Sequence, residues 1–163
     1  MKIQNFKKMK KKILILLFLL PAFVYSQDLK HWASSNIATW SLIFSAGAFD
    51  GFNQSLEFHY DRVDAKLHLY DKFWNPSISW TNKYKNGDPN QGVRFPFSTT
   101  ALVWTTDGYH LTRFLSHDCI VVGLTVKFWN VKRKWYWYAA DIVSYFLVYD
   151  LGFNALYEVF TMK

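Results

Sequence analysis

Cysteine is nearly absent from this sequence: Cys119 is the only one in 163 residues. A single cysteine excludes an internal disulfide, so the fold must be held by packing alone. The apolar residues that flank Cys119 indicate a packed thiol rather than a nucleophile. No internal repeat and no low-complexity tract is present either, which excludes a solenoid or other repeat architecture.

Acidic residues are missing from the start of the chain, where the first one is Asp28. Six of the nineteen basic residues precede it: Lys2, Lys7, Lys8, Lys10, Lys11 and Lys12. Beyond residue 26, thirteen Lys or Arg stand against twelve Asp or Glu, a net charge of +1 compared with +7 for the whole chain. Because the excess charge belongs to the first residues, the sequence does not indicate a nucleic-acid partner.

A mostly apolar run, ILILLFLLPAFVYS, follows the lysines and ends at Ser26. It is short for a membrane span but fits the hydrophobic region of a secretory signal. Val24 and Ser26 are small enough to precede a cleavage site. We therefore expect a signal peptide over residues 1–26 and a single helical domain over residues 27–163, exported to the bacterial inner membrane or periplasm. An uncleaved anchor helix is the alternative.

The rest of the chain predicts an all-α fold, because apolar residues recur with helical spacing over three long segments. These segments cover about residues 34–67, 99–129 and 135–160. A long aromatic-rich connection over residues 70–97 contains Asn-Pro, Asn-Gly and Asp-Pro turn signals. Ser98 or Thr99 is the expected N-cap of the second helix.

Aromatic residues make up 20% of the chain and charged residues only 19%, a composition that favours helices embedded in a membrane. The third segment fits best, with aromatic residues at both ends. The second carries Asp107, Arg113 and Asp118, which would cost about 8–10 kcal/mol if charged and central, against about 4–6 kcal/mol returned by its apolar residues. It could therefore enter lipid only with its polar side turned to partner helices. An aromatic-rich periplasmic helical domain is the alternative.

Charged residues of the second segment fall on one stripe of a helical wheel: Asp107, His110, Arg113, His117 and Asp118. Asp50 and Glu57 belong to a similar stripe on the first segment, and Asp150, Asn154 and Glu158 to one on the third. We expect the stripes to face one another, with Asp107, His110 and His117 against Asp50 and Glu57 and with Arg113 neutralised by an acid. Gly47 and Gly51, four residues apart, would permit close helix approach.

The same seven residues are the candidate catalytic set: Asp50, Glu57, Asp107, His110, Arg113, His117 and Asp118. A histidine oriented by an aspartate could act as a general base, and Arg113 could hold a phosphate or carboxylate. The alternatives are a purely structural hydrogen-bonded network and a stripe in solvent. No metal or cofactor motif is present. The sequence thus predicts a structural or partner-binding envelope protein in contact with membrane lipids and with other envelope proteins. A membrane-embedded enzyme acting on a lipid or phosphate-bearing headgroup by His/Asp chemistry is the alternative.

Overall fold

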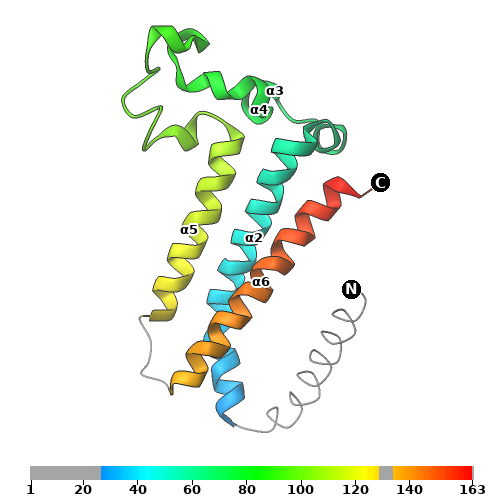
Figure 1. Cartoon of the computed structure of the whole chain (residues 1–163), viewed down its shortest axis with the longest axis vertical. Coiled ribbons are helices and arrows are strands. Elements are labelled where there is room, and N and C mark those ends of the chain that lie inside the picture. The colour runs from blue at the N-terminus through cyan, green and yellow to red at the C-terminus, as the bar shows by residue number, and fades with distance from the viewer. Residues whose placement is uncertain (1–26, 129–133, 163) are drawn as a thin grey trace, which may run out of the picture. The chain divides into compact units, whose positions relative to one another are not determined.

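The computed structural model describes residues 27–128 and 134–162 (Figure 1). The chain divides into two compact units, Met1–Ile37 and Ala38–Lys163. The expected signal peptide over residues 1–26 lies outside the described residues, as do residues 129–133. The expectation of one domain over residues 27–163 stays a prediction.

Three long helices make the described part of the chain all-α, as predicted. They are α2 (Gln27–Leu67), which begins in the first unit, α5 (Gly108–Phe128) and α6 (Trp135–Thr161). Within the second unit these helices run side by side (Figure 1). The first helix starts earlier than expected, and the third has almost the expected bounds. The prediction for the second was wrong by nine residues, because residues 99–107 form turns and a short 3₁₀ segment instead.

Residues 68–107 form an ordered headpiece between α2 and α5 (Figure 1). Its short elements are α3 (Asp71–Trp74), α4 (Pro76–Ser79), η1 (Trp80–Lys83), η2 (Lys85–Gly87), η3 (Pro89–Gln91) and η4 (Val103–Thr105). The Asn-Pro and Asp-Pro signals act as helix starts. The Asn75 side chain accepts from Ser77 N over 3.1 Å, and the Asp88 side chain accepts from Asn90 N over 2.9 Å. Proline follows each cap, where its missing N–H costs nothing.

Glycines let α2 and α6 approach closely, as the spacing of Gly47 and Gly51 predicted. A Cβ atom added at Gly47 would collide with the carbonyl oxygen of Tyr149, and one at Gly152 would collide with that of Phe44. Only residues without a side chain fit where two backbones come this near.

Small and polar residues also form the face of α5 that is buried: Gly108, Thr112, Ser116, Gly123 and Lys127. Thr39 of α2 donates a hydrogen bond to the carbonyl oxygen of Gly123 over 3.2 Å. The few buried apolar residues of the chain include Leu56, Val63 and Phe160, which form a small core beside the headpiece. The interior is therefore polar over much of the bundle.

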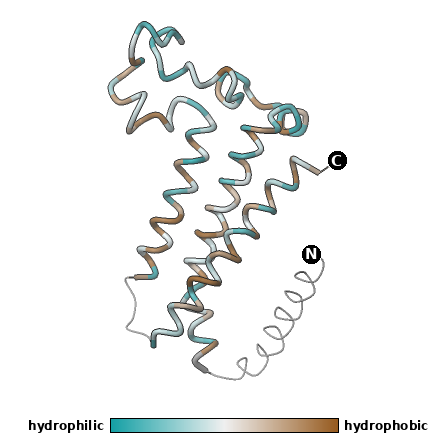
Figure 2. The backbone as a smooth tube through the Cα atoms, viewed as in Figure 1, coloured by the Kyte–Doolittle hydropathy of each residue, from teal (hydrophilic) through white to brown (hydrophobic). Residues whose placement is uncertain are grey.

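Charge is distributed unevenly along the outside of the bundle. We define the apolar end as residues 38–49 of α2, 119–128 of α5 and 135–149 of α6. Its two charged residues, Lys127 and Asp141, are both buried. Within the second unit, the exposed charges of these helices lie instead toward the headpiece: Glu57, Asp61, Arg62, Lys66, Arg113, Asp118, Asp150 and Glu158. Figure 2 shows the same trend, with hydrophobic segments along α5 and α6 and a mostly hydrophilic headpiece.

None of the described helices combines the length and the hydropathy that crossing a membrane requires.

Candidate functional site

Asp107 lies at the start of α5 and is the most deeply buried of the seven candidate residues, with a side chain 1% exposed. Its carboxylate accepts hydrogen bonds from the backbone N–H of His110 over 2.9 Å and from Thr106 Oγ1 over 3.0 Å. An aspartate in this position is an N-cap, because it satisfies an N–H that has no partner within the helix. This cap explains why the helix begins at Gly108 and not at Thr99.

His110 is held against the same carboxylate. Its Nδ1 lies 2.8 Å from both carboxylate oxygens of Asp107, and its side chain is 28% exposed. In a neutral ring whose Nδ1 faces a carboxylate, Nδ1 carries the proton and Nε2 keeps its lone pair. An aspartate that orients an imidazole in this way is the arrangement that general-base chemistry requires.

The remaining candidates do not join this pair. Glu57, Arg113, His117 and Asp118 are exposed, and no ion pair joins Arg113 to an acid within the described part of the chain. Its guanidinium instead lies 3.3 Å from the hydroxyl of Tyr109. The expectation of one buried stripe on α5 was therefore wrong. Large charged side chains would hold the helices apart, so the small residues of α5 face inward.

The third helix shows the same inversion. Asp150, Asn154 and Glu158, which were expected inside, are exposed. Tyr157 beside them is half-buried, and its hydroxyl lies 3.2 Å from Nε2 of His59.

Asn53 is the residue of α2 that bonds to this part of α5. It is 2% exposed, and its amide donates to the carbonyl oxygen of Tyr109 over 2.7 Å and to Thr112 Oγ1 over 2.8 Å. The expected meeting of Glu57 with His110 or His117 is therefore corrected to a contact between Asn53 and Thr112. An uncharged amide serves here because burying it with partners costs far less than burying a carboxylate.

Asp50 belongs to a second polar contact, which joins all three helices. The Tyr149 hydroxyl donates to Asp50 Oδ2 over 2.7 Å and also shares a hydrogen bond with Ser116 of α5. Burial and the bond to Asp50 raise the pKa of Tyr149 to about 12. The phenol therefore stays protonated and donating at neutral pH.

A buried ion pair that the sequence reasoning missed links α5 to α6. Lys127 Nζ lies 3.3 Å from Asp141 Oδ1, and the side chains are 8% and 5% exposed. A signal was present, because each residue is the only charge in its stretch of the apolar end, and a lone charge among apolar residues needs a partner.

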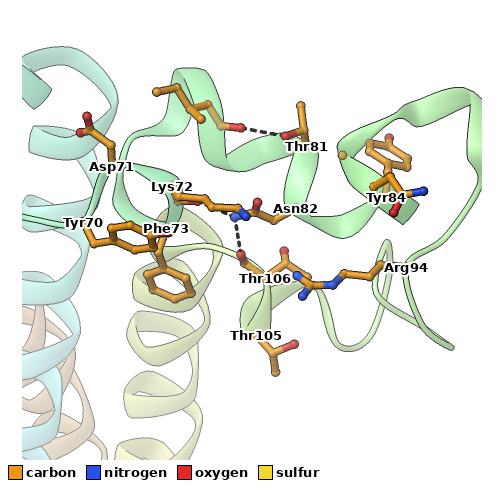
Figure 3. Close-up of a pocket in the computed structure, with 13 residues that line it drawn as sticks. Tyr70, Asp71, Lys72, Phe73, Thr81, Asn82, Tyr84, Arg94, Thr105 and Thr106 are labelled. Carbon is orange, nitrogen blue, oxygen red and sulfur yellow. Dashed lines mark hydrogen bonds between the residues drawn. The ribbon is translucent and has the colours of Figure 1, made fainter.

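The headpiece contains an open pocket of about 1070 Å³ (Figure 3). Lys72 and Arg94 enter it from opposite sides. Its other lining residues are Tyr70, Asp71, Phe73, Ile78, Thr81, Asn82, Tyr84, Asn86, Gly87, Thr105 and Thr106. The pocket adjoins the Asp107–His110 pair through Thr106, whereas His110 does not line it. Sequence reasoning did not find this pocket, although a long ordered connection rich in aromatic and basic residues is a typical place for a binding site.

The described residues show neither a metal-binding cluster nor a reactive thiol. No group of three or more His, Cys, Asp or Glu side chains suited to a metal ion occurs among the described residues. Burial raises the pKa of the Cys119 thiol, and the negative charge of Asp118 raises it further, so the thiol is protonated and unreactive at neutral pH.

The chain matches no protein-family model, no curated protein and no solved structure.

Proposed function

We propose that this chain is a structural, partner-binding component of the bacterial envelope whose apolar end packs against lipid acyl chains. One observation carries the proposal: the apolar end buries both of its charged residues and exposes large apolar side chains. Thr39, Lys127 and Asp141 are buried there. Val143, Phe146 and Leu147 of α6 are 55%, 70% and 60% exposed.

In water, the exposed apolar side chains of the apolar end contribute no free energy of burial. Fully burying a large apolar side chain contributes about 1.5–3 kcal/mol, and that gain is lost where the side chain stays in water. Contiguous apolar surfaces of this kind usually mark a contact with a membrane or another protein. In lipid the apolar end regains its burial energy, and the hydrogen bonds inside the bundle are shielded from water.

An apolar groove between the three helices supports lipid as the partner. It has a volume of about 350 Å³ and is lined by Ile43, Ile120, Leu124, Ile142, Tyr145, Phe146 and Tyr149. Its apolar walls suit a hydrocarbon chain. At the start of α6, Trp135, Tyr136 and Tyr138 are exposed, and such aromatic residues favour the boundary between lipid and water.

Partition between buffer and phospholipid vesicles tests the proposal with two matched valines of α6. Val143 lies at the apolar end and Val159 near the headpiece, and their exposures are 55% and 50%. An aspartate at the centre of a bilayer costs about 2.5–3.5 kcal/mol. Val143→Asp should therefore weaken vesicle binding by about tenfold or more, whereas Val159→Asp should leave it almost unchanged.

Circular dichroism of both variants controls for folding, since each replaced side chain points outward. Equal vesicle binding by the two variants would count against lipid contact at the apolar end. So would a wild-type chain that stays monomeric in buffer and does not bind vesicles.

The Asp107–His110 pair favours a second candidate, an enzyme that acts on a phosphate-bearing headgroup. The supporting observation is the 2.8 Å contact between the carboxylate and Nδ1, which leaves Nε2 available as a base. Hydrolysis of a chromogenic phosphate monoester by the full chain is the test. His110→Asn should abolish turnover and His117→Asn, which removes an exposed histidine of the same helix, should not. Equal rates for the two variants, or no turnover by the wild type, would exclude this candidate.

A further inference from the structure

The walls of the headpiece pocket carry the chemistry of an anion site. Tyr70, Phe73 and Tyr84 offer aromatic surface. The hydroxyl groups of the threonines that line it already donate to backbone carbonyl oxygens, so the donors left for an anion are the cationic side chains. The volume of about 1070 Å³ is at the upper end of the range of pockets that hold small molecules. A ligand of this site would therefore combine a polar group with an apolar or aromatic part.

The positive charges of two side chains that line the pocket are not neutralised by an ion pair within the described residues. These side chains belong to Lys72 and Arg94. In Figure 3 the Arg94 guanidinium lies toward Thr106, and Lys72 extends along the opposite wall toward Asn82. Two like charges that converge on one hollow repel each other and raise the local positive potential, so an anion bound between them is stabilised.

The one acid of the pocket wall is directed elsewhere. Asp71 Oδ1 accepts a 2.7 Å hydrogen bond from the Tyr60 hydroxyl. Its carboxylate points away from Lys72 in Figure 3. Burial and this hydrogen bond raise the pKa of Tyr60, so the phenol remains a donor at neutral pH. Tyr60 thus holds the carboxylate of Asp71 away from Lys72.

Backbone hydrogen bonds hold the cationic segments in place. The Asn82 amide donates to the carbonyl oxygens of Lys72 over 2.6 Å and of Thr106 over 3.0 Å, which ties two walls together (Figure 3). Arg94 N donates to the carbonyl oxygen of Lys83 over 3.0 Å, beside the antiparallel bridge between Tyr84 and Val93. A site whose backbone is fixed in this way loses little entropy when a ligand binds.

We propose that the headpiece pocket binds a phosphate-bearing small molecule, with Lys72 and Arg94 holding the phosphate. The guanidinium of arginine matches two phosphate oxygens at once, whereas lysine supplies a mobile point charge. The tyrosine and phenylalanine walls accept the rest of the ligand. The site depends neither on what surrounds the apolar end nor on chemistry at His110, so it goes beyond both functions proposed above.

Calorimetric titration of the full chain in a neutral detergent tests the site. The soluble probes are phenyl phosphate and inorganic phosphate, with phenol as the uncharged control. A second arm uses neutral phosphatidylcholine vesicles with and without phosphatidic acid. Binding of the soluble probes identifies a free phosphate ester as the ligand type, and a preference for phosphatidic acid alone identifies a lipid headgroup.

Matched variants locate the binding. A hydrogen bond to a charged group contributes enough to change an affinity by about tenfold or more, so Arg94→Gln and Lys72→Gln should each weaken phosphate binding by at least that factor. Arg113→Gln removes an exposed cation of α5 that does not line the pocket and should have less than about a twofold effect, because solvent screens an exposed charge outside the site.

Tyr60→Phe gives an independent readout, because it leaves both cations in place and frees Asp71 to approach Lys72. It should weaken phosphate binding, whereas Tyr136→Phe, far along the chain on α6, should not. Circular dichroism checks that each variant is folded; all the replaced side chains except Tyr60 are exposed, so loss of folding is not expected. Equal weakening by pocket and control variants, or no phosphate binding in either arm at millimolar concentration, would overturn the proposal.

Discussion

The hydroxyl of Tyr149 on α6 lies 2.7 Å from a carboxylate oxygen of Asp50 on α2 and donates a hydrogen bond to it. Because Ser116 of α5 bonds to the same hydroxyl, this contact joins the three long helices at one level. Asp50 and Tyr149 are only half-buried. The hydrogen bond nevertheless joins two residues that lie 99 positions apart in the sequence. It is the strongest candidate for a contact that fixes how the helices pair.

Replacing Tyr149 with phenylalanine removes the donor and leaves Asp50 without it. Loss of one partner of a partly buried hydrogen bond to a charged group costs about 1–3 kcal/mol, so Tyr149→Phe should lower the free energy of unfolding by that amount at pH 7. Chemical denaturation measures it. Tyr136→Phe, an exposed tyrosine of the same helix, is the control and should lie within about 0.5 kcal/mol of the wild type.

Alkaline pH should act on the same bond. The pKa of Tyr149 is raised from 10.0 to about 12 in the folded protein, so folding favours the protonated phenol. The stability that this preference contributes is complete below pH 10 and is lost as the pH rises toward 12. The difference in unfolding free energy between the wild type and Tyr149→Phe should therefore shrink from pH 9 to pH 12. A difference that stays constant over that interval would contradict the shifted pKa.

Gly152→Ala should destabilise the protein, although alanine is the better helix former by about 1 kcal/mol. The added Cβ would collide with the backbone of Phe44, and backbone atoms of a packed helix cannot move aside cheaply. Overpacking of this kind typically costs about 1–3 kcal/mol. Thermal unfolding checks the sign, with Asn154→Ala, an exposed position on the same helix, as the control. Equal or higher stability of Gly152→Ala would show that α2 and α6 are further apart than described.

The sequence predicted the three helices, the close approach at Gly47 and Gly51 and the long aromatic-rich connection, because each depends on local periodicity or on single residue types. It failed on which side of α5 faces inward. A helical wheel separates a polar arc from an apolar one but does not say which arc is buried. In water-soluble bundles the apolar arc is inside; we assumed charged residues inside, whereas the small ones, Thr112, Ser116 and Gly123, are the residues that pack.

The pocket could not be predicted for a different reason. Its walls come from several segments between Tyr70 and Thr106. Their meeting depends on hydrogen bonds between segments, such as those of the Asn82 amide and of Arg94 N. Likewise the Asp107–His110 contact was anticipated as a type of pairing. Its role as a helix cap was missed because the helix was expected to begin at Thr99.

Substitutions of Lys127 and Asp141 should have non-additive effects on the free energy of unfolding. Breaking a buried ion pair by removing one partner typically costs about 3–5 kcal/mol, whereas replacing both with apolar residues is often neutral. Lys127→Met should therefore be strongly destabilising, and Lys127→Met combined with Asp141→Leu should recover most of the loss. A double-mutant cycle in chemical denaturation measures the coupling. Additive effects of the two substitutions would mean that the pair contributes nothing beyond its separate residues.

Asp107 should contribute to stability mainly through its capping hydrogen bonds. Asp107→Ala removes the acceptor for His110 N and should cost about 0.5–2 kcal/mol, as N-cap replacements do, whereas asparagine is about as good a cap as aspartate. Asp107→Asn should therefore keep most of the stability. Asp118→Ala, an exposed aspartate of the same helix, is the control and should change stability by less than about 0.5 kcal/mol.

The pair of substitutions at Asp107 also separates the cap from any chemistry at His110. Asparagine preserves the bond to the backbone but cannot supply the negative charge that stabilises a protonated imidazole. If His110 acts as a base, Asp107→Asn should abolish turnover of a phosphate monoester while the melting temperature stays close to that of the wild type. If the cap is the only role, the two measurements should change together: Asp107→Ala should lower stability, Asp107→Asn should not, and neither variant should differ in activity once the folded fraction is taken into account. Equal melting temperatures for Asp107→Ala and Asp118→Ala would contradict the buried cap itself.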